Sequence, residues 1–362
     1  MMFKQVMKKL PLICLLGLLS CKFTPYSGND IYNNEAGPPQ DEALHFKNSL
    51  EWWYFTGHLS DVHSGKEYGV EYVVFHFNPR NKHDYLMTNF AVTDPANNLF
   101  LHDYKIEKQD SLLQPELPVY LAINDKNRSH ILQGAEGKYT IEANMAKQKV
   151  AITLSTEPSK PVLLHNGTGY ETYGEYTKAG YYSYPRLQAT GRLYINGDSV
   201  EVAGELWYDR QWNCVGVWQK QVAWDWISIQ LDQPKEELML YRLHHFGDNN
   251  VLYGGSYYTS NNEVISIDKK DIKLIELDFW KSGKSKAIYP VKWKLAIDKL
   301  DLDVTIEARM PNQELGVGFT SLYKLYYWEG MCSVVGTMGG EPVTGKSYVE
   351  LTNRDAFKKY RD

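Results

Sequence analysis

Short runs of β-branched and aromatic residues, separated by turn-forming residues, follow one another along almost the whole chain after residue 45. Clear examples are VEYVVFHF (70–77), YLMTNFAVT (85–93), YTIEA (139–143), KVAITLST (149–156) and KWKLAI (292–297). Such runs are typical of β-strands. Helical periodicity is hard to find in this part of the chain. The sequence therefore predicts an all-β protein.

Two hairpin signals indicate antiparallel strands. Asn196-Gly197 separates two alternating runs within residues 191–209, and this dipeptide is the strongest short-range signal for a tight hairpin. A second hairpin is expected within residues 226–243. Closely spaced hairpins are typical of barrels and sandwiches. Because the chain has 27 tyrosines and 10 tryptophans to line a large interior, we expect β-barrels with an interior pocket.

The length of 362 residues exceeds what one compact core usually holds, so two domains are expected. The best position for a seam is 210–222. The strands before it belong to the Asn-Gly hairpin, and those after it begin another series of hairpins. We therefore predict an N-terminal domain over 46–215 and a C-terminal domain over 216–362.

The N-terminus has the features of an export signal. Residues 1–20 join a lysine-containing start to an apolar run that is too short to span a bilayer. The run ends at Leu18-Leu19-Ser20-Cys21, which resembles the lipobox of bacterial lipoproteins, with Cys21 as the lipidated residue. Leu19 is bulkier than the usual residue there, which leaves cleavage without lipidation open. Residues 21–45 are expected to be a flexible tether, so we predict a lipid-anchored protein of the bacterial cell envelope.

Charge and motifs exclude several function classes. The net charge is −5 and the charged residues are dispersed, which argues against nucleic-acid binding. The mature chain keeps Cys214 and Cys332, for which a disulfide and two buried free thiols are both compatible with an oxidising compartment. No CxxC or His-rich spacing indicates a metal site, and nothing indicates a cofactor. The common hydrolase and nucleotide-binding motifs are also missing.

Glutamate and consecutive aromatic residues occur together in SLEWWYFTGHL (49–59). Strand alternation places Trp52 and Tyr54 on one face and Glu51, Trp53 and Phe55 on the other. In a protein of two packed barrels, one face can look into its own barrel while the other packs against the neighbouring domain. On this interpretation Glu51 is the partner of a buried donor and not a catalytic acid.

Two further clusters combine acids with tryptophan. In GELWYDRQW (204–212), alternation places Trp207, Asp209 and Gln211 on one face, and Tyr208, Arg210 and Trp212 on the other. In Trp224-Asp225-Trp226, the two indoles share a face and the carboxyl group lies opposite. A carboxyl group enclosed by indole rings has a raised pKa and can act as a general acid. Asp225 and Asp209 are therefore the candidate catalytic residues.

A purely structural interpretation of these clusters also stands. Buried aromatic residues dominate core packing without any further purpose, and the acids can face solvent or form structural ion pairs. Arg210 beside Asp209 would hold that carboxyl group ionised if the two side chains met.

Taken together, the clusters resemble the AttH and CrtC family, which includes carotenoid 1,2-hydratases. The resemblance runs from about residue 45 to the C-terminus and rests on the segments 51–59, 181–191, 204–212, 224–226, 238–241, 327–330 and 345–352. It implies two packed lipocalin-like (calycin) antiparallel β-barrels and a pocket for isoprenoid-like or other lipophilic molecules. Where many relatives have Asp-His-Glu/Gln-Trp-Gly, this chain has Asp209-Arg210-Gln211-Trp212-Asn213, so no role that rests on that histidine carries over.

The proposed reaction is protonation of a C=C bond, with aromatic faces stabilising the carbocation before water adds or a proton leaves. The residues expected to bind the ligand are Trp52, Tyr54, Tyr182, Arg186, Arg210, Trp212, Trp224 and Trp226. The sequence leaves two alternatives to a hydratase or isomerase. One is a non-catalytic lipid-binding lipoprotein that works with an ABC transporter, and the other is a carbohydrate-binding or carbohydrate-cleaving protein with two carboxyl groups across an open groove.

Overall fold

The computed structural model describes residues 35–45, 50–77, 83–109, 113, 116–125, 128–174, 177–213, 222–246, 250–320, 323–354 and 357. The predicted signal segment, Cys21, most of the predicted tether and Cys214 lie outside these ranges. Within them, no helix has the length and the apolar character needed to cross a membrane. The helical elements found there are short 3-10 turns: η1 (Gln40–Glu42), η3 (Pro95–Asn97), η4 (His165–Gly167), η5 (Lys269–Asp271) and η6 (Asp298–Leu300).

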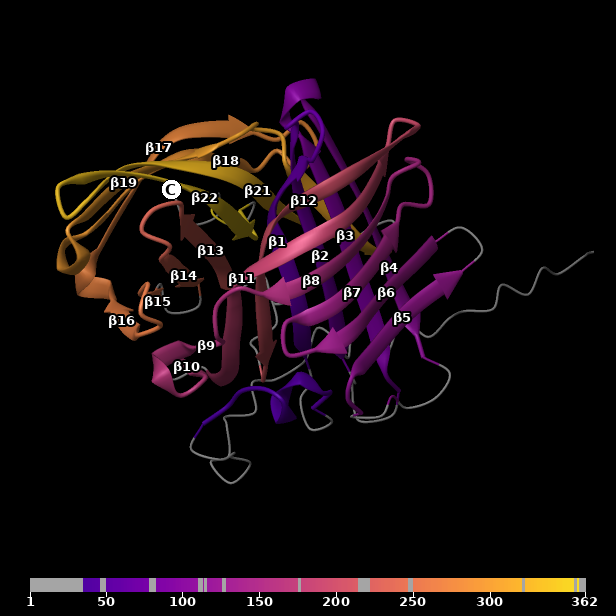
Figure 1. The fold of residues 1–362 in the computed structure, drawn as a ribbon, viewed down its shortest axis with the longest axis horizontal. Coiled ribbons are helices and arrows are strands. Elements are labelled where there is room, and N and C mark those ends of the chain that lie inside the picture. The colour runs from indigo at the N-terminus through magenta and orange to yellow at the C-terminus, as the bar shows by residue number, and fades with distance from the viewer. Residues whose placement is uncertain are drawn as a thin grey trace, which may run out of the picture.

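The N-terminal half forms one antiparallel sheet in the order β4-β3-β2-β1-β12-β11-β8-β7-β6-β5, with β9 and β10 also pairing with β11. β3 and β5, from opposite ends of this order, contact each other, so the sheet curls into a barrel (Figure 1). Its strands are β1 (Glu51–Asp61), β2 (Glu67–Phe77), β3 (Tyr85–Asp94), β4 (Leu99–Lys108), β5 (Val119–Asp125), β6 (Arg128–Ala135), β7 (Lys138–Asn144), β8 (Ala151–Pro158), β9 (Leu163–Leu164), β10 (Tyr170–Tyr173), β11 (Thr177–Ile195) and β12 (Asp198–Trp212).

The C-terminal half forms a second antiparallel sheet in the order β16-β15-β14-β13-β22-β21-β19-β18-β17, with β20 pairing with β21. Its strands are β13 (Val222–Leu231), β14 (Glu237–His245), β15 (Asn250–Tyr258), β16 (Val264–Asp268), β17 (Ile272–Lys281), β18 (Ile288–Ile297), β19 (Leu302–Ala308), β20 (Glu314–Thr320), β21 (Tyr323–Met338) and β22 (Glu341–Thr352). The two curved sheets pack side by side (Figure 1). The predicted all-β fold of two packed antiparallel barrels is confirmed.

Both predicted hairpins are present. Asn196 and Gly197 have φ of 55° and 91° and connect β11 to β12, with Ile195 paired to Asp198. Positive φ at both central residues suits the right-handed twist of the paired strands, and asparagine and glycine tolerate it best. The second hairpin joins β13 to β14, with Gln230 paired to Glu237.

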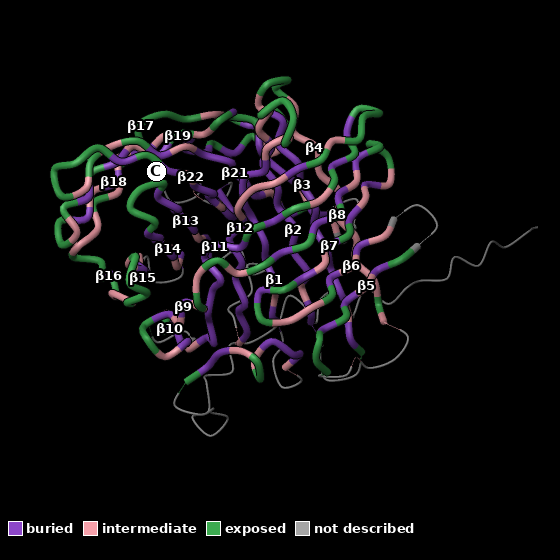
Figure 2. The backbone as a smooth tube through the Cα atoms, in the orientation of Figure 1, coloured by how far each residue is buried: buried purple, intermediate pink, exposed green. Residues whose placement is uncertain are grey.

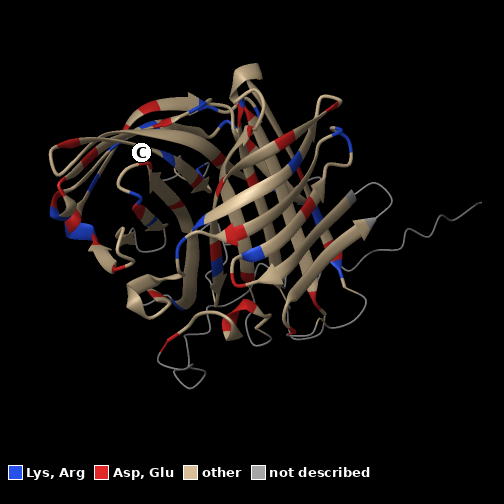
Figure 3. Cartoon of the chain, in the orientation of Figure 1, with Lys and Arg blue, Asp and Glu red and all other residues tan. Residues whose placement is uncertain are grey.

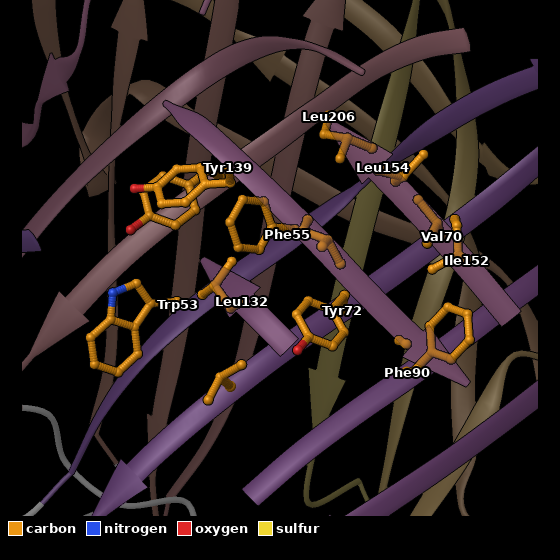
Figure 4. Close-up of a cluster of buried hydrophobic side chains, with 14 of the residues drawn as sticks. Trp53, Phe55, Val70, Tyr72, Phe90, Leu132, Tyr139, Ile152, Leu154 and Leu206 are labelled. Carbon is orange, nitrogen blue, oxygen red and sulfur yellow. The ribbon is translucent and has the colours of Figure 1, made fainter. Parts of the chain in front are cut away.

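The interior of the N-terminal barrel is filled by side chains. Trp53, Phe55, Tyr72 and Tyr139 belong to one buried cluster and point into the space between strands (Figure 4). The central strands β1, β2, β12, β13 and β22 are buried along most of their length (Figure 2), because one face meets a barrel core and the other meets the neighbouring barrel. Acidic and basic residues are interspersed over both barrels (Figure 3).

The opening strand β1 follows the predicted alternation. Trp53 and Phe55 lie in the core of the N-terminal barrel, whereas Tyr54 packs in the cluster between the barrels with Trp52 beside it. Glu51 faces the barrel side and accepts hydrogen bonds from Arg210 Nη2 at 2.5 Å and from His76 Nδ1 at 2.8 Å. Burial alone would raise the pKa of Glu51, but the charge of Arg210 and these hydrogen bonds hold it well below its usual range. Glu51 is a structural partner of a buried cation, as predicted.

A candidate ligand cavity between the two barrels

An aromatic cavity lies between the two barrels and not inside either of them. Its volume is about 800 Å³, including the part open to solvent. It is lined by Trp52, Tyr54, Val73, Phe75, Tyr173, Tyr181, Asp209, Gln211, Trp224, Trp226, Tyr241, Leu243, Tyr327, Glu329 and Glu350. The expectation of a pocket inside a barrel is thus wrong for this cavity. Aromatic side chains occupy the N-terminal barrel interior, and the cavity forms where the outer faces of the two sheets do not close.

The cavity wall is aromatic and comes from both barrels. The ring centroids of Trp52 and Trp224 are 6.2 Å apart, and those of Tyr54 and Trp226 are 5.5 Å apart with the rings edge to face. Both are pairs across the seam, because β1 belongs to the first sheet and β13 to the second. Offset and edge-to-face rings of this kind contribute roughly 0.5–1.5 kcal/mol per pair beyond area burial. The wall therefore also holds the two barrels together.

Asp209 lies in this wall and is held by three donors. Tyr181 donates to Oδ2 at 2.6 Å, while Ser183 and the indole of Trp207 donate to Oδ1 at 2.5 and 2.6 Å. Burial raises the pKa of Asp209 to about 6, and the three hydrogen bonds oppose that rise by favouring the carboxylate. Asp209 therefore titrates close to neutral pH.

His165 contacts Ser183, one of the three donors to Asp209. Its Nε2 and Nδ1 atoms lie 2.8 Å from Ser183 Oγ and 2.9 Å from Ser256 Oγ. Burial lowers the pKa of His165 to about 3, so the imidazole is neutral and exchanges hydrogen bonds with the two hydroxyl groups without adding charge. It fixes the position of Ser183 and, through it, of Asp209.

Two glutamates face the cavity from the C-terminal barrel. Glu329 accepts a hydrogen bond from the hydroxyl of Tyr54 at 2.7 Å, and Glu350 is its direct partner in the β21–β22 register. Burial, then repulsion from Glu350 and Glu71, raises the pKa of Glu329 well above its usual range. Burial raises the pKa of Glu350 to about 7. Both carboxyl groups are therefore protonated at higher pH than ordinary glutamates.

Glu71 lies beside them on β2, on the same face as Val73 and Phe75. It is fully buried, and in the described part of the chain neither of its carboxyl oxygens has a hydrogen-bond partner. Burial and the nearby Glu350 raise its pKa well above the usual range. A third glutamate, without a hydrogen-bond partner, therefore lies near Glu329 and Glu350.

The structure brings together part of the predicted site. Trp52, Tyr54, Asp209, Trp224 and Trp226 all line the cavity. Glu329 and Glu350 also line it, and neither was predicted as a site residue. The only available signal was their place in the C-terminal segments YWEG and YVELT, because the pairing that joins them is long-range.

Asp225 does not line the cavity, which corrects its selection as a catalytic acid. It accepts hydrogen bonds from Arg242 Nε at 2.6 Å and Arg354 Nη2 at 2.5 Å. Burial would raise the pKa of Asp225, but the two guanidinium charges hold it far below its usual range. Asp225 is therefore an ionised structural residue on the face opposite the two tryptophans.

The other four predicted ligand-binding residues also lie away from the cavity. Tyr182 and Trp212 belong to the core of the N-terminal barrel. Arg210 is fully buried on that side, with its guanidinium carbon 3.9 Å from the ring centroid of Trp53. Arg186 forms ion pairs of 2.7 Å with Glu205 and Glu237, tying the two barrels together. Strand alternation turns the first three toward the barrel interior, and ion pairs occupy the fourth.

Across the described ranges, no group of three His, Cys, Asp or Glu side chains is arranged to hold a metal ion. Cys332 is a buried free thiol that contacts the carbonyl oxygen of Gly330 at 3.4 Å.

Comparison with known proteins gives the family. Among solved structures, a protein described as AttH from Nitrosomonas europaea has a TM-score of 0.75 and 24% identity, covering 90% of this chain and 98% of that one. Kievitone hydratase from Nectria haematococca has a TM-score of 0.68 and 16% identity, covering 88% and 93%. CghA has a TM-score of 0.52 and 10% identity, covering 89% and 94%. At these identities the likeness is one of fold.

The comparison with curated proteins finds no match. A family model described as AttH-like matches residues 33–354, which is nearly the whole chain. The resemblance drawn from the sequence motifs is confirmed, and the chain belongs to the AttH-like family.

Proposed function

We propose that this protein binds a lipophilic small molecule between its barrels and acts on a C=C bond of that molecule as a hydratase or isomerase. The observation that carries the proposal is the set of three carboxyl groups, Asp209, Glu329 and Glu350, exposed to one aromatic cavity. Acids in such surroundings have pKa values suited to proton transfer near neutral pH. The similar fold of kievitone hydratase adds support by analogy.

The surroundings of each carboxyl group indicate which one donates a proton and which one accepts it. Burial and repulsion from Glu350 and Glu71 disfavour the carboxylate form of Glu329, so Glu329 supplies the proton. Asp209 has three donors that favour its carboxylate, so it accepts one. This assignment reverses the role that the sequence analysis gave to Asp209.

The reaction then balances as follows. The acid transfers its proton to one alkene carbon, which forms a C–H bond and leaves a carbocation at the other carbon. The faces of Trp52, Trp224 and Trp226 stabilise that charge. Water adds through an oxygen lone pair and loses a proton to Asp209; in an isomerase, a neighbouring C–H bond gives its proton to Asp209 instead. Proton exchange with solvent at the open side of the cavity then returns a proton to the acid and removes one from Asp209.

Deuterium incorporation tests the chemistry. Acyclic isoprenoid alkenes are incubated with the purified protein in D2O, and products are analysed by mass spectrometry for added water and for new C–D bonds. We expect incorporation with the wild type and a loss of at least about 100-fold for Glu329→Gln and Asp209→Asn, the typical contribution of a general acid or base. Glu307→Gln, an acid on the outer surface of β19, is the matched control.

A non-catalytic lipid-binding protein would give a different result. Native mass spectrometry of protein purified from its own host identifies the bound molecule. A bound lipid without turnover, whose retention does not depend on Glu329 or Asp209, would overturn the enzymatic proposal and favour a lipid-binding partner of an ABC transporter. Recovery of only an oligosaccharide would overturn both.

The export signal leads to a separate proposal, that a lipid on Cys21 anchors the protein in the cell envelope. The support is the sequence pattern around Ser20 and Cys21. Metabolic labelling with palmitate and membrane fractionation test it. The wild type is expected in the membrane fraction with label, and Cys21→Ser is expected to lose the label and leave that fraction.

A further inference from the structure

The cavity has an unbalanced charge. Asp209, Glu329 and Glu350 contribute carboxyl groups, whereas no Lys, Arg or His is among the described residues that line it. Glu71, with no hydrogen-bond partner, lies close enough to repel Glu329. The cavity therefore combines several acids with no cation of its own.

Some buried acids of this protein have cationic partners, whereas others, such as Glu42 and Glu314, are held by tyrosine and serine hydroxyl groups. Glu51 has Arg210, Asp225 has Arg242 and Arg354, and Glu237 has Arg186 and Lys160 at 2.7 Å each. Leaving a buried carboxylate without a partner is costly. Arginine and lysine partners therefore occur in these barrels, but none of the ion pairs among the described residues includes an acid that lines the cavity.

The cavity wall offers a second feature that favours positive charge. Trp52, Trp224 and Trp226 bring three indoles to one space, with Tyr54 and Tyr181 beside them. The face of an indole attracts a cation within about 6 Å of its centroid, and cages of such rings are a known solution for organic ammonium groups. A fatty acid or a phosphate ester would instead meet only like charge.

We infer that the ligand is a lipophilic molecule with a positively charged nitrogen, whose ammonium group lies against the tryptophans and pairs with Glu350. This inference rests on the proposed function, since it names the class of molecule that the same cavity binds. The charge of the amine supplies a cationic partner for Glu350, and the carbon skeleton covers the aromatic wall.

Three compounds that share one carbon skeleton and differ in their head group test the role of the ligand's charge. Geranylamine, geraniol and geranic acid are titrated at pH 7.5 into the purified protein, and quenching of tryptophan fluorescence reports binding. We expect geranylamine to bind at least tenfold more tightly than geraniol, and geranic acid to bind more weakly than geraniol. Glu350→Gln should bring the amine to the affinity of the alcohol, while Glu307→Gln on the outer surface should change neither affinity.

The remaining outcomes separate this inference from the proposed function. Equal binding of amine and alcohol, or tightest binding of the acid, overturns the inference and leaves a lipophilic cavity in place. Tight amine binding that Glu350→Gln retains overturns the role of this glutamate. Failure of all three compounds to bind contradicts the proposed isoprenoid-like ligand itself. Near-UV circular dichroism verifies the folding of each variant, and Glu350 is only partly buried, so its replacement by glutamine is expected to leave the fold intact.

Discussion

Tyr181 donates its hydroxyl proton to Oδ2 of Asp209 across 2.6 Å, and the same hydroxyl oxygen accepts the indole N–H of Trp226 at 2.9 Å. Tyr181 and Asp209 belong to the first barrel, and Trp226 belongs to the second. The orientation of the cavity carboxylate is therefore set by a hydrogen bond that crosses the seam, and the two barrels must be docked for the site to be complete.

Removal of this hydroxyl should change the titration of Asp209. In Tyr181→Phe, Asp209 loses a donor that favours its carboxylate, so its pKa should rise above about 6. The pH dependence of ligand turnover should therefore shift to more alkaline pH. The free energy of unfolding should also fall by about 1–2 kcal/mol. Tyr194→Phe, at an exposed tyrosine on the same strand, is the control. An unchanged pH profile would contradict the role given to Tyr181.

Glu350→Gln should stabilise the protein at alkaline pH. The pKa of Glu350 is raised from 4.5 to about 7 in the folded state, so the wild type gains stability from this group below pH 4.5 and loses it as pH rises through about 7. A glutamine cannot ionise and escapes that loss. At pH 8 the variant should exceed the wild type by on the order of 2 kcal/mol, with little difference at pH 4.5. Urea unfolding at both pH values measures the effect, and a difference that does not change with pH would contradict it.

Asp225→Asn should destabilise the protein without changing ligand binding in the cavity. The change removes the buried carboxylate that Arg242 and Arg354 share and leaves them only Glu276, which costs up to roughly 3–5 kcal/mol. Because Asp225 faces away from the ligand, affinity per folded molecule should match the wild type. The two quantities are measured by denaturant unfolding and by fluorescence titration. Lost affinity with unchanged stability would restore Asp225 to the site.

Gly330→Ala should destabilise the second barrel. A Cβ atom at Gly330 would lie 1.8 Å from the ring of Trp328, which is fully buried and packs beside Trp293. Such overpacking costs about 1–3 kcal/mol, and it displaces the strand that holds Glu329. The melting temperature should fall, and ligand affinity should fall with it. A Cβ atom at Gly283 meets no atom within 4 Å, so Gly283→Ala is the matched control.

Alternation made the faces of single strands predictable. The separation of Trp52 and Tyr54 from Trp53 and Phe55 followed from it, and so did the position of Asp225 opposite the tryptophans beside it. The prediction of Asp225 as a ligand-facing acid ignored that constraint, because one regular strand cannot turn Trp224, Asp225 and Trp226 into the same cavity. The choice of Asp225 rested on its position between two tryptophans in the sequence and not on the direction in which its side chain points.

Other parts of the site depend on pairings that local patterns do not contain. Glu329 and Glu350 meet through the β21–β22 register, and both reach Tyr54 and Asp209 only through the docking of the two sheets. Nothing near Tyr182 or Trp212 in the sequence shows which face of their strands points into the barrel. The strands could be read from the sequence, but the space between the barrels could not.

The two faces of β1 also bear on how proteins of this kind diversify. Exchanges at Trp52 and Tyr54 alter what the cavity accepts, while Trp53 and Phe55 on the opposite face keep the barrel intact. Substitutions at Trp52 and Tyr54 therefore change the cavity wall and the packing of the seam together, while the barrel core on the opposite face is left unchanged. A scaffold built this way can pass from one ligand to another through few substitutions, which suits a fold shared by chains with less than a quarter of their residues in common.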